Sequence, residues 1–357
     1  MTKARPRAWM PAFAAVFCLA LASASAETIV PDEVFASPQR LVAVEGDRRL
    51  NLFCTGEGAP TVLLEAGSGN GMVTWRFVQA EIAEFARVCA YDRAGLGFSD
   101  AASRPSDLRA MADDLHRLLR AAGVGLPIVL VAHSLGGESA ALYAMLHPDD
   151  VAGAVLVEPS FAGFLDAMQA EMPADKRAGI TDAMRKVVAR KRACLDLAKA
   201  GRLDPPDGDA ARACIDARGD PDRLDGALER VASRQLAEPK TISAMLSEMA
   251  GFVPDDDRPD LDTAELEAAP FAFGDKPLIV LSRGVVEGGP GVPKEALARV
   301  EAAWRAGHAA LAARSTRGVH IVVPGARHYV QIDRPDAVID AVRRVVGAVR
   351  QGGGAWP

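Results

Sequence analysis

In "VLVAHSLGG", residues 129–137, an apolar run leads into a serine that has a small residue two positions before it and another two positions after it. Residues 128–132 are predicted to form a buried strand and residues 138–146 a helix, so Ser134 is expected at the turn between them. A tight strand-to-helix turn strains the serine and brings neighbouring backbone close, which requires small residues two positions before and after it. Those positions hold alanine and glycine. The pattern therefore predicts a serine hydroxyl presented at the carboxyl edge of a sheet.

Short β-branched runs alternate with helical segments on both sides of this turn. Strands are predicted at 40–45, 48–54, 61–66, 87–91, 127–133, 152–158, 277–281 and 319–323. Such alternation is typical of an α/β fold whose mostly parallel sheet is covered by helices on both faces. Strands vanish between 161 and 272, where charged helical segments take over. We therefore expect a core formed by 27–160 and 273–350, a helical cap inserted at 161–272, and a flexible tail at 351–357.

Composition narrows the classes of partner. The 357 residues are 49% hydrophobic and 25% charged, with a net charge of −6, which is an ordinary globular balance. No run of lysine and arginine is dense enough to bind a phosphate backbone, so nucleic acid is not an expected partner. No metal-ligand spacing is present, and neither a metal nor an organic cofactor is expected. The oligomeric state is left open.

The N-terminus has the pattern of an export signal. Three basic residues within the first seven positions precede an apolar stretch at 12–22, and Ala24-Ser25-Ala26 forms a small-x-small cleavage site. The apolar stretch is shorter than the roughly 20 residues that a spanning helix needs, which disfavours an uncleaved anchor. We expect a signal peptide at 1–26, cleaved after Ala26, and a periplasmic or secreted protein without a stable membrane anchor.

Four cysteines remain after that cleavage: Cys54, Cys89, Cys194 and Cys214. An even number of cysteines in an oxidising compartment favours disulfide pairing. Three connectivities are possible from the residues alone.

Five stretches together resemble the α/β-hydrolase fold family, and the resemblance covers nearly the whole mature chain. It implies a mostly parallel eight-stranded sheet and a serine-based catalytic site far more specifically than it implies a substrate. Ala132 replaces the family's usual first glycine of the serine turn, and Ala66 stands where many members have histidine. The stretches are "LLEAGSGNG" (63–71), "YDRAGLGFSD" (91–100), "AHSLGG" (132–137), "VLVEPS" (155–160) and "GARHYVQIDRP" (325–335).

Ser134 is a weak nucleophile at its own pKa, so it needs a base, and histidine suits that task near neutral pH. The family's chain order of serine, acid and histidine places the base late in the chain. The resemblance assigns the base to His328, in a loop after the last predicted strand. His308 and His320 lie on a predicted helix and strand, where packing or surface roles are more common. His133 is expected to shape the serine turn.

The acid that orients the base has two candidates. Glu158 directly follows an apolar strand, which places its carboxylate at the carboxyl edge of the sheet. Glu287 lies in the loop after 277–283, where many family members carry the acid. We favour Glu158. Asp92 and Asp333 are expected to brace loops beside the site.

The resemblance also implies an oxyanion hole and a disulfide pattern. The backbone N–H groups of Ser68 and Leu135 would stabilise the oxyanion, each contributing about 3 kcal/mol in the transition state. The family's sheet order would place the strands of Cys54 and Cys89 side by side, which favours that pair and leaves Cys194 to pair with Cys214.

The expected function is therefore hydrolysis of an ester-like small-molecule acyl substrate through an acyl-serine intermediate. Acyl transfer to an alcohol or thiol by the same residues is the alternative. A binding module on a hydrolase scaffold is less favoured, because Ser134 and His328 are both present. Haloalkane and epoxide chemistry are disfavoured because those relatives have aspartate at the position of Ser134. The sequence does not identify the substrate.

Overall fold

The computed structural model describes residues 31–206, 208–215, 226–254, 260–268, 272–286 and 293–352. The expected signal peptide at 1–26 lies outside these residues, as do Glu287 and positions 353–357 of the expected tail. Among the described residues, no helix is both long and apolar enough to cross a membrane.

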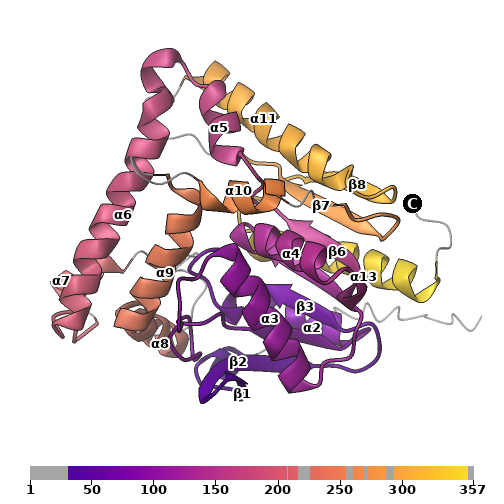
Figure 1. The fold of residues 1–357 in the computed structure, drawn as a ribbon, viewed down its shortest axis with the longest axis horizontal. Helices are drawn as coiled ribbons and strands as arrows, with labels where there is room; N and C mark the ends of the chain where they lie inside the picture. The colour runs from indigo at the N-terminus through magenta and orange to yellow at the C-terminus, as the bar shows by residue number, and fades with distance from the viewer. Residues whose placement is uncertain are drawn as a thin grey trace, which may run out of the picture.

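An eight-stranded sheet forms the centre of the protein, with the spatial order β1-β2-β4-β3-β5-β6-β7-β8 (Figure 1). Strand β2 is antiparallel to both of its neighbours, and all other neighbouring pairs are parallel. The predicted α/β class with a mostly parallel sheet is confirmed. The strands are β1 (Arg40–Glu45), β2 (Arg48–Thr55), β3 (Val62–Glu65), β4 (Val88–Tyr91), β5 (Ile128–His133), β6 (Val151–Val157), β7 (Leu278–Arg283) and β8 (Gly318–Val323).

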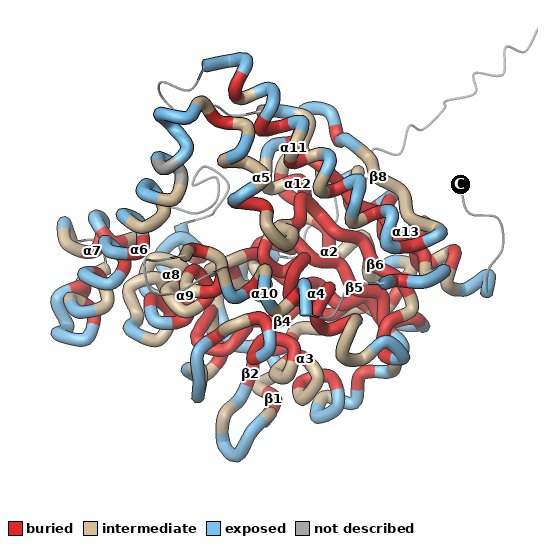
Figure 2. Tube along the Cα trace, turned by 45° about the horizontal axis from the view of Figure 1, so that its top comes forward, coloured by how far each residue is buried: buried red, intermediate tan, exposed pale blue. Residues whose placement is uncertain are grey.

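Helices cover both faces of the sheet, and alternate strand residues supply the two apolar layers. Leu63 and Leu130 face the layer of α3 (Leu108–Ala122), α4 (Leu135–Leu146) and the end of α11 (Lys294–Ala312). Leu64 and Val131 face the layer of α2 (Arg76–Ala83), α12 (Val330–Asp333) and α13 (Pro335–Arg350). Figure 2 shows the central strands as an almost continuous buried band. Short helices complete the core: α1 (Asp32–Phe35), η1 (Met72–Trp75) and η2 (Pro148–Asp150).

Between β6 and β7 the described chain is helical, and much of it projects to one side of the sheet (Figure 1). Helices α6 and α9 pack against each other, and Cys194, Leu203 and Ile242 belong to a small apolar core of this region. The helices are α5 (Phe164–Ala170), η3 (Ala174–Lys176), α6 (Arg177–Lys199), α7 (Asp209–Cys214), α8 (Gly226–Leu236), α9 (Pro239–Phe252) and α10 (Leu261–Ala268). We call this group of helices the cap.

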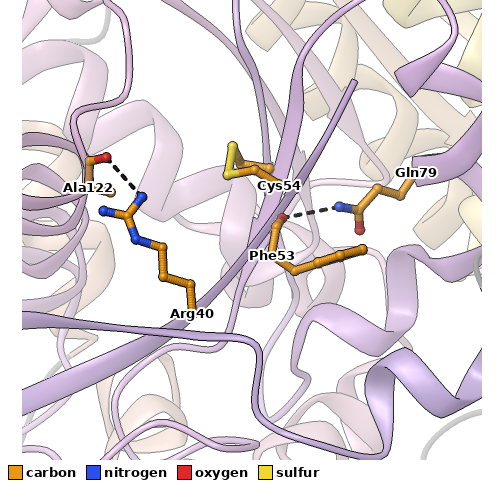
Figure 3. The surroundings of a disulfide bond; sticks show 6 residues. Arg40, Phe53, Cys54, Gln79 and Ala122 are labelled. Atoms are coloured by element: carbon orange, nitrogen blue, oxygen red, sulfur yellow. Dashed lines mark hydrogen bonds between the residues drawn. A yellow bond between two sulfur atoms is a disulfide. The ribbon is translucent and has the colours of Figure 1, made fainter. Parts of the chain in front are cut away.

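Two disulfides link the four cysteines of the described chain. Cys54 of β2 lies directly opposite Cys89 of β4 in the antiparallel register, and their sulfur atoms are bonded. Figure 3 shows this disulfide between two hydrogen bonds: Arg40 donates to the carbonyl of Ala122, and Gln79 donates to the carbonyl of Phe53. Cys194 and Cys214 form the second disulfide, which joins α6 to α7. This is the pairing that the resemblance implied.

Candidate active site

Ser134 lies at the turn between β5 and α4 with a left-handed backbone, at φ 53° and ψ −125°. Few non-glycine residues adopt a positive φ, and those that do cluster at functional sites. Backbone hydrogen bonds hold the turn in place. The Ser134 N–H donates to the carbonyl of Val157 (3.2 Å), and its carbonyl accepts from Gly137 (2.8 Å) and Ser160 (3.0 Å). These bonds, to the end of β6, the start of α4 and the segment after β6, hold Ser134 in its strained backbone conformation.

Close packing explains the small residues after the serine. A Cβ at Gly136 would lie 2.6 Å from the carbonyl oxygen of Ala66, and one at Gly137 would lie 2.5 Å from Pro159. Helix α4 begins at Leu135, three residues earlier than the sequence predicted. Gly136 and Gly137 have low helix propensity, but the close approach of Ala66 and Pro159 requires glycine at both positions. As a result, the N-terminus of α4 lies immediately after Ser134, where its dipole favours negative charge.

His328 lies in the loop between β8 and α12, and its Nε2 is 3.2 Å from the Ser134 hydroxyl oxygen. A second histidine fixes the same loop, because His133 Nε2 lies 2.9 Å from the carbonyl oxygen of His328. Since a carbonyl can only accept, His133 donates there through Nε2–H. Burial, followed by the nearby His328, lowers the pKa of His133 to about 3, so this ring stays neutral. His133 therefore positions the loop of the candidate base.

Glu158 follows β6 directly, is fully buried and also has a positive φ, 48°. Its Oε1 lies 3.8 Å from Nδ1 of His328, on the opposite side of the imidazole from Ser134. Burial alone would raise the pKa of this carboxyl. The facing His328 and the positive charge of Arg283 outweigh it, and the pKa falls to about 2. Glu158 is therefore an anion at neutral pH, as a residue that stabilises an imidazolium must be.

The groups that hold Glu158 were not predicted from the sequence. Arg283 donates to it twice, from its backbone N–H to Oε2 (2.7 Å) and from its guanidinium to Oε1 (2.8 Å). The indole N–H of Trp304 also donates to Oε1 (2.8 Å). Arg283 forms a second ion pair with Glu301 of α11 at 2.9 Å. Only the position of Arg283 could have been noticed in the sequence. It ends β7, and the carboxyl ends of the parallel neighbours β6 and β7 meet at one edge of the sheet.

His308 and His320 lie away from the serine in a hydrogen-bonded chain. Ser282 Oγ is 2.5 Å from His308 Nδ1 and 2.7 Å from His320 Nε2, and His308 Nε2 is 2.8 Å from the carbonyl oxygen of Pro159. Burial lowers the pKa of His308 to about 4. These bonds link β7, β8 and α11, and His308 Nδ1 also lies 4.0 Å from Oε2 of Glu158.

The loop after β3 passes beside the serine turn. A Cβ at Gly67 would lie 2.8 Å from the His133 ring and 3.1 Å from Cβ of Ser134, so only glycine allows this approach. Ser68 follows in the same loop, and Leu135 is the first residue of α4. Leu135 therefore directly follows Ser134, and Ser68 follows the glycine that approaches it most closely.

Two aspartates brace the neighbouring loops, as expected. Asp92 accepts from Asn51 (2.9 Å) and from the backbone N–H groups of Met72 (2.9 Å) and Phe98 (3.1 Å). Asp333 accepts from the backbone N–H and the guanidinium of Arg327, next to His328.

A cavity open to solvent extends from the loop after β3 beneath the cap. Asn70 and Tyr329 line its end beside the candidate site, and Leu228 and Leu236 of α8 line it from the cap. Its remaining walls are mostly apolar.

Within the described part of the chain, His116, His147 and Asp150 form a group whose possible metal-ligating atoms lie within 4.8 Å of one another. The two imidazoles are stacked, with centroids 4.0 Å apart and planes 12° from parallel. Ring nitrogens in parallel planes do not converge on one ion. Asp150 is also already bound by Arg120 (3.1 Å) and Tyr143 (2.9 Å). This arrangement fits a packed surface cluster rather than a metal site.

Comparison with known proteins gives a consistent result. A family model described as the alpha/beta hydrolase fold matches residues 60–199. A curated relative from Bacillus subtilis, the uncharacterized protein YqjL, is 33% identical over 105 residues, which are 29% of this chain and 42% of the relative. The matched region therefore spans less than half the length of that relative.

Two solved structures resemble this one over most of their length. A thermophilic esterase from Thermogutta terrifontis has a TM-score of 0.55 and 24% identity, covering 88% of this chain and 99% of that one. The epoxide hydrolase CorEH has a TM-score of 0.55 and 19% identity, covering 87% and 98%. At these identities the likeness shows the fold alone.

Proposed function

We propose that this chain, which has the α/β-hydrolase fold and matches the model of that family over residues 60–199, is an exported serine hydrolase that cleaves an ester-like acyl substrate. The observation that carries the proposal is the alignment of Ser134, His328 and Glu158, with the imidazole between the hydroxyl and the carboxylate. This order of nucleophile, base and orienting acid is the one that acyl transfer requires.

In the proposed reaction, Nε2 of His328 takes the proton of Ser134 as the serine oxygen attacks the substrate carbonyl. Glu158 stabilises the imidazolium that results, because it remains ionised. The backbone N–H groups of Ser68 and Leu135 stabilise the oxyanion, together with the N-terminus of α4. His328 then returns the proton to the leaving alcohol. A water molecule, activated by the same imidazole, releases the acid from the acyl-serine.

Two further features support the exported, ester-directed form of the proposal. Both disulfides suit an oxidising compartment. The apolar cavity next to Tyr329 suits an uncharged small-molecule substrate rather than an ionic one. The resemblance assigns aspartate to the nucleophile position of dehalogenases and epoxide hydrolases, whereas this chain has Ser134.

The test is a panel of esters of graded acyl length, with an epoxide and a haloalkane included, assayed on the purified mature protein. We expect hydrolysis of esters that is abolished in Ser134→Ala, together with loss of labelling by a fluorophosphonate probe. Ser139→Ala, one turn and a half along α4, is the matched control and should keep both. Labelling that persists in Ser134→Ala, or turnover of only the epoxide or the haloalkane, would overturn the proposal. An added alcohol acceptor distinguishes hydrolysis from acyl transfer by the product.

A further inference from the structure

The buried side chain of Arg93 holds the loop at 66–70 in place. The Arg93 guanidinium donates to the carbonyl of Ala66 at 2.5 Å and to the carbonyl of Gly67 at 2.7 Å. It also forms an ion pair with Glu65, at 3.0 Å. Because the Gly67 carbonyl and the Ser68 N–H belong to one planar peptide group, and the Ala66 carbonyl lies in the peptide before it, Arg93 sets the orientation of the expected oxyanion donor.

A carboxylate from the cap completes this arrangement. Glu248 lies on α9 and is fully buried, 1% exposed. Its Oε2 accepts from the backbone N–H of Gly69 at 2.6 Å, and its Oε1 accepts from Nε of Arg93 at 2.9 Å. One side chain of the cap therefore touches both the residue after Ser68 and the arginine that holds the residues before it. These contacts exist only when α9 is seated on the core.

We propose that Glu248 is a positioning residue for the oxyanion hole, through which seating of the cap sets the orientation of the Ser68 peptide. The inference rests on the proposed function, because it concerns the same reaction. Glu248 does not touch the reacting atoms, and it acts through Gly69 and Arg93. When the cap is displaced, the Ser68 N–H would no longer point at the oxyanion. Closure of the cap over the substrate cavity is thereby coupled to catalysis.

The charge of Glu248 matters to this role as well as its shape. Burial alone would lower the pKa of Arg93, but the two carboxylates beside it, Glu248 and Glu65, outweigh burial and raise it. Removal of one carboxylate would leave the guanidinium to rely on Glu65 and on the loop carbonyls. A glutamine at this position has a single acceptor oxygen, so either the Gly69 N–H or the Arg93 Nε–H would lose its acceptor at the same time. Either loss acts on the loop at 66–70. A shift of a few tenths of an ångström in this loop would move the Ser68 N–H relative to the oxyanion.

The test compares Glu248→Gln with Ser247→Ala. Ser247 is the preceding residue on α9 and also joins the cap to the core, by accepting from the backbone N–H of Ser106 at 2.6 Å, but it does not touch the loop at 66–70. Removal of a whole oxyanion donor typically costs 10²- to 10³-fold in kcat. We therefore expect Glu248→Gln to lower kcat by about tenfold or more, up to that limit, with KM within about twofold. Ser247→Ala should stay close to wild type in kcat.

Binding of a transition-state analogue distinguishes a positioning role from a purely structural one. A boronic acid that forms a tetrahedral adduct with Ser134 should lose affinity in Glu248→Gln by about the factor lost in kcat/KM. Hydrogen exchange of the Gly69 amide should also become faster in Glu248→Gln than in Ser247→Ala. An unchanged kcat, or a rise in KM alone with unchanged boronate affinity, would refute the positioning role.

Failure of the proposed function would look different. In that case wild type itself would neither hydrolyse esters nor label at Ser134, whatever residue stood at 248. If Glu248→Gln does not fold at the assay temperature, Glu248→Asp serves under the same criteria. It keeps the negative charge but shortens the side chain by one methylene, which withdraws the carboxylate from both Gly69 and Arg93, so a loss of kcat at constant KM is again expected, and wild-type kcat would refute the role.

Discussion

Oε1 of Glu158 faces Nδ1 of His328 across 3.8 Å, while Nε2 of the same ring lies 3.2 Å from the Ser134 hydroxyl oxygen. The carboxylate reaches this place because β6 ends one residue before it, and a positive φ turns Glu158 toward the loop after β8. The distance is longer than a hydrogen bond, and catalytic contacts of this kind commonly tighten only with substrate bound. The geometry makes Glu158 the group whose charge the imidazolium would use.

Replacement of this acid by an amide is the first prediction. Glu158→Gln keeps the size of the side chain but loses the charge that stabilises the imidazolium, and a comparable change in a serine protease lowered kcat by about 10⁴. We expect a fall in kcat of several hundredfold or more with little change in KM, because the charge acts mainly in the transition state. Steady-state kinetics on the best ester of the panel provide the measurement.

Two matched variants test whether the loss of kcat comes from the charge that Glu158 presents to the imidazole, or would follow the loss of any carboxylate nearby. Glu301→Gln removes the other carboxylate that pairs with Arg283, and Glu287→Gln removes the competing acid candidate. Both should remain within a few fold of wild type in kcat. If Glu287→Gln shows the large loss and Glu158→Gln does not, the acid belongs after β7.

The disulfides give the second prediction. On a chain-entropy estimate, closing the segments between residues separated by 35 and 20 positions stabilises the fold by roughly 3 to 4 kcal/mol each. Peptide mapping of the exported protein without reductant should recover Cys54 joined to Cys89 and Cys194 joined to Cys214. The reduced and alkylated protein is the control, and its free energy of unfolding should be lower. Four thiols that alkylate in the native protein would show that neither bond exists.

Local patterns predicted the fold well because each strand carries its own signal. The predicted strand at 40–45 has the same limits in the structure, and the one at 48–54 differs by a single residue. The position of α4 was predicted less well. Its first turn contains Gly136 and Gly137, whose propensity opposes a helix, and only the tertiary contacts with Ala66 and Pro159 explain their presence.

The candidate site was likewise predicted only in part from the sequence. Ser134, Glu158 and His328 each follow a strand closely, so sheet topology brings them to one edge, and this could be anticipated. Trp304 and Glu248 reach the site from the middle of helices, 146 and 179 positions from the residues that they contact. No local pattern distinguishes them from ordinary helix residues, because their role depends on how α9 and α11 pack.

Export gives the third prediction. When the full chain is expressed with its own leader in a bacterial host, the periplasmic or secreted protein should begin at Glu27, because Ala24 and Ala26 provide the small residues of the cleavage site. N-terminal sequencing or intact mass is the measurement. Ala26→Trp places a bulky side chain at the cleavage site and should leave the precursor unprocessed. A mature fraction that retains Met1 would contradict the assignment.

The fourth prediction concerns a buried carboxyl in the cap. Asp262 lies on α10, is 2% exposed, and packs directly against Gly251 of α9. Its Oδ1 has no hydrogen-bond partner. Burial, reinforced by the negative charge of Asp260, raises the pKa of Asp262 to about 8. The folded protein therefore keeps a proton that the unfolded chain releases near pH 4.

The sign follows from this difference in bound protons. Between about pH 4 and pH 8 the folded state binds more protons than the unfolded state, so the contribution of Asp262 to stability falls as the pH rises and becomes constant above about pH 8. Asp262→Asn stays neutral at every pH and escapes that loss. We expect the melting temperature of Asp262→Asn, relative to wild type, to be higher at pH 8.5 than at pH 5. Asp182→Asn, an exposed change on α6, is the control and should show no such trend. A difference between Asp262→Asn and wild type that is equal at both pH values would mean that Asp262 ionises in the folded protein as it does in the unfolded chain.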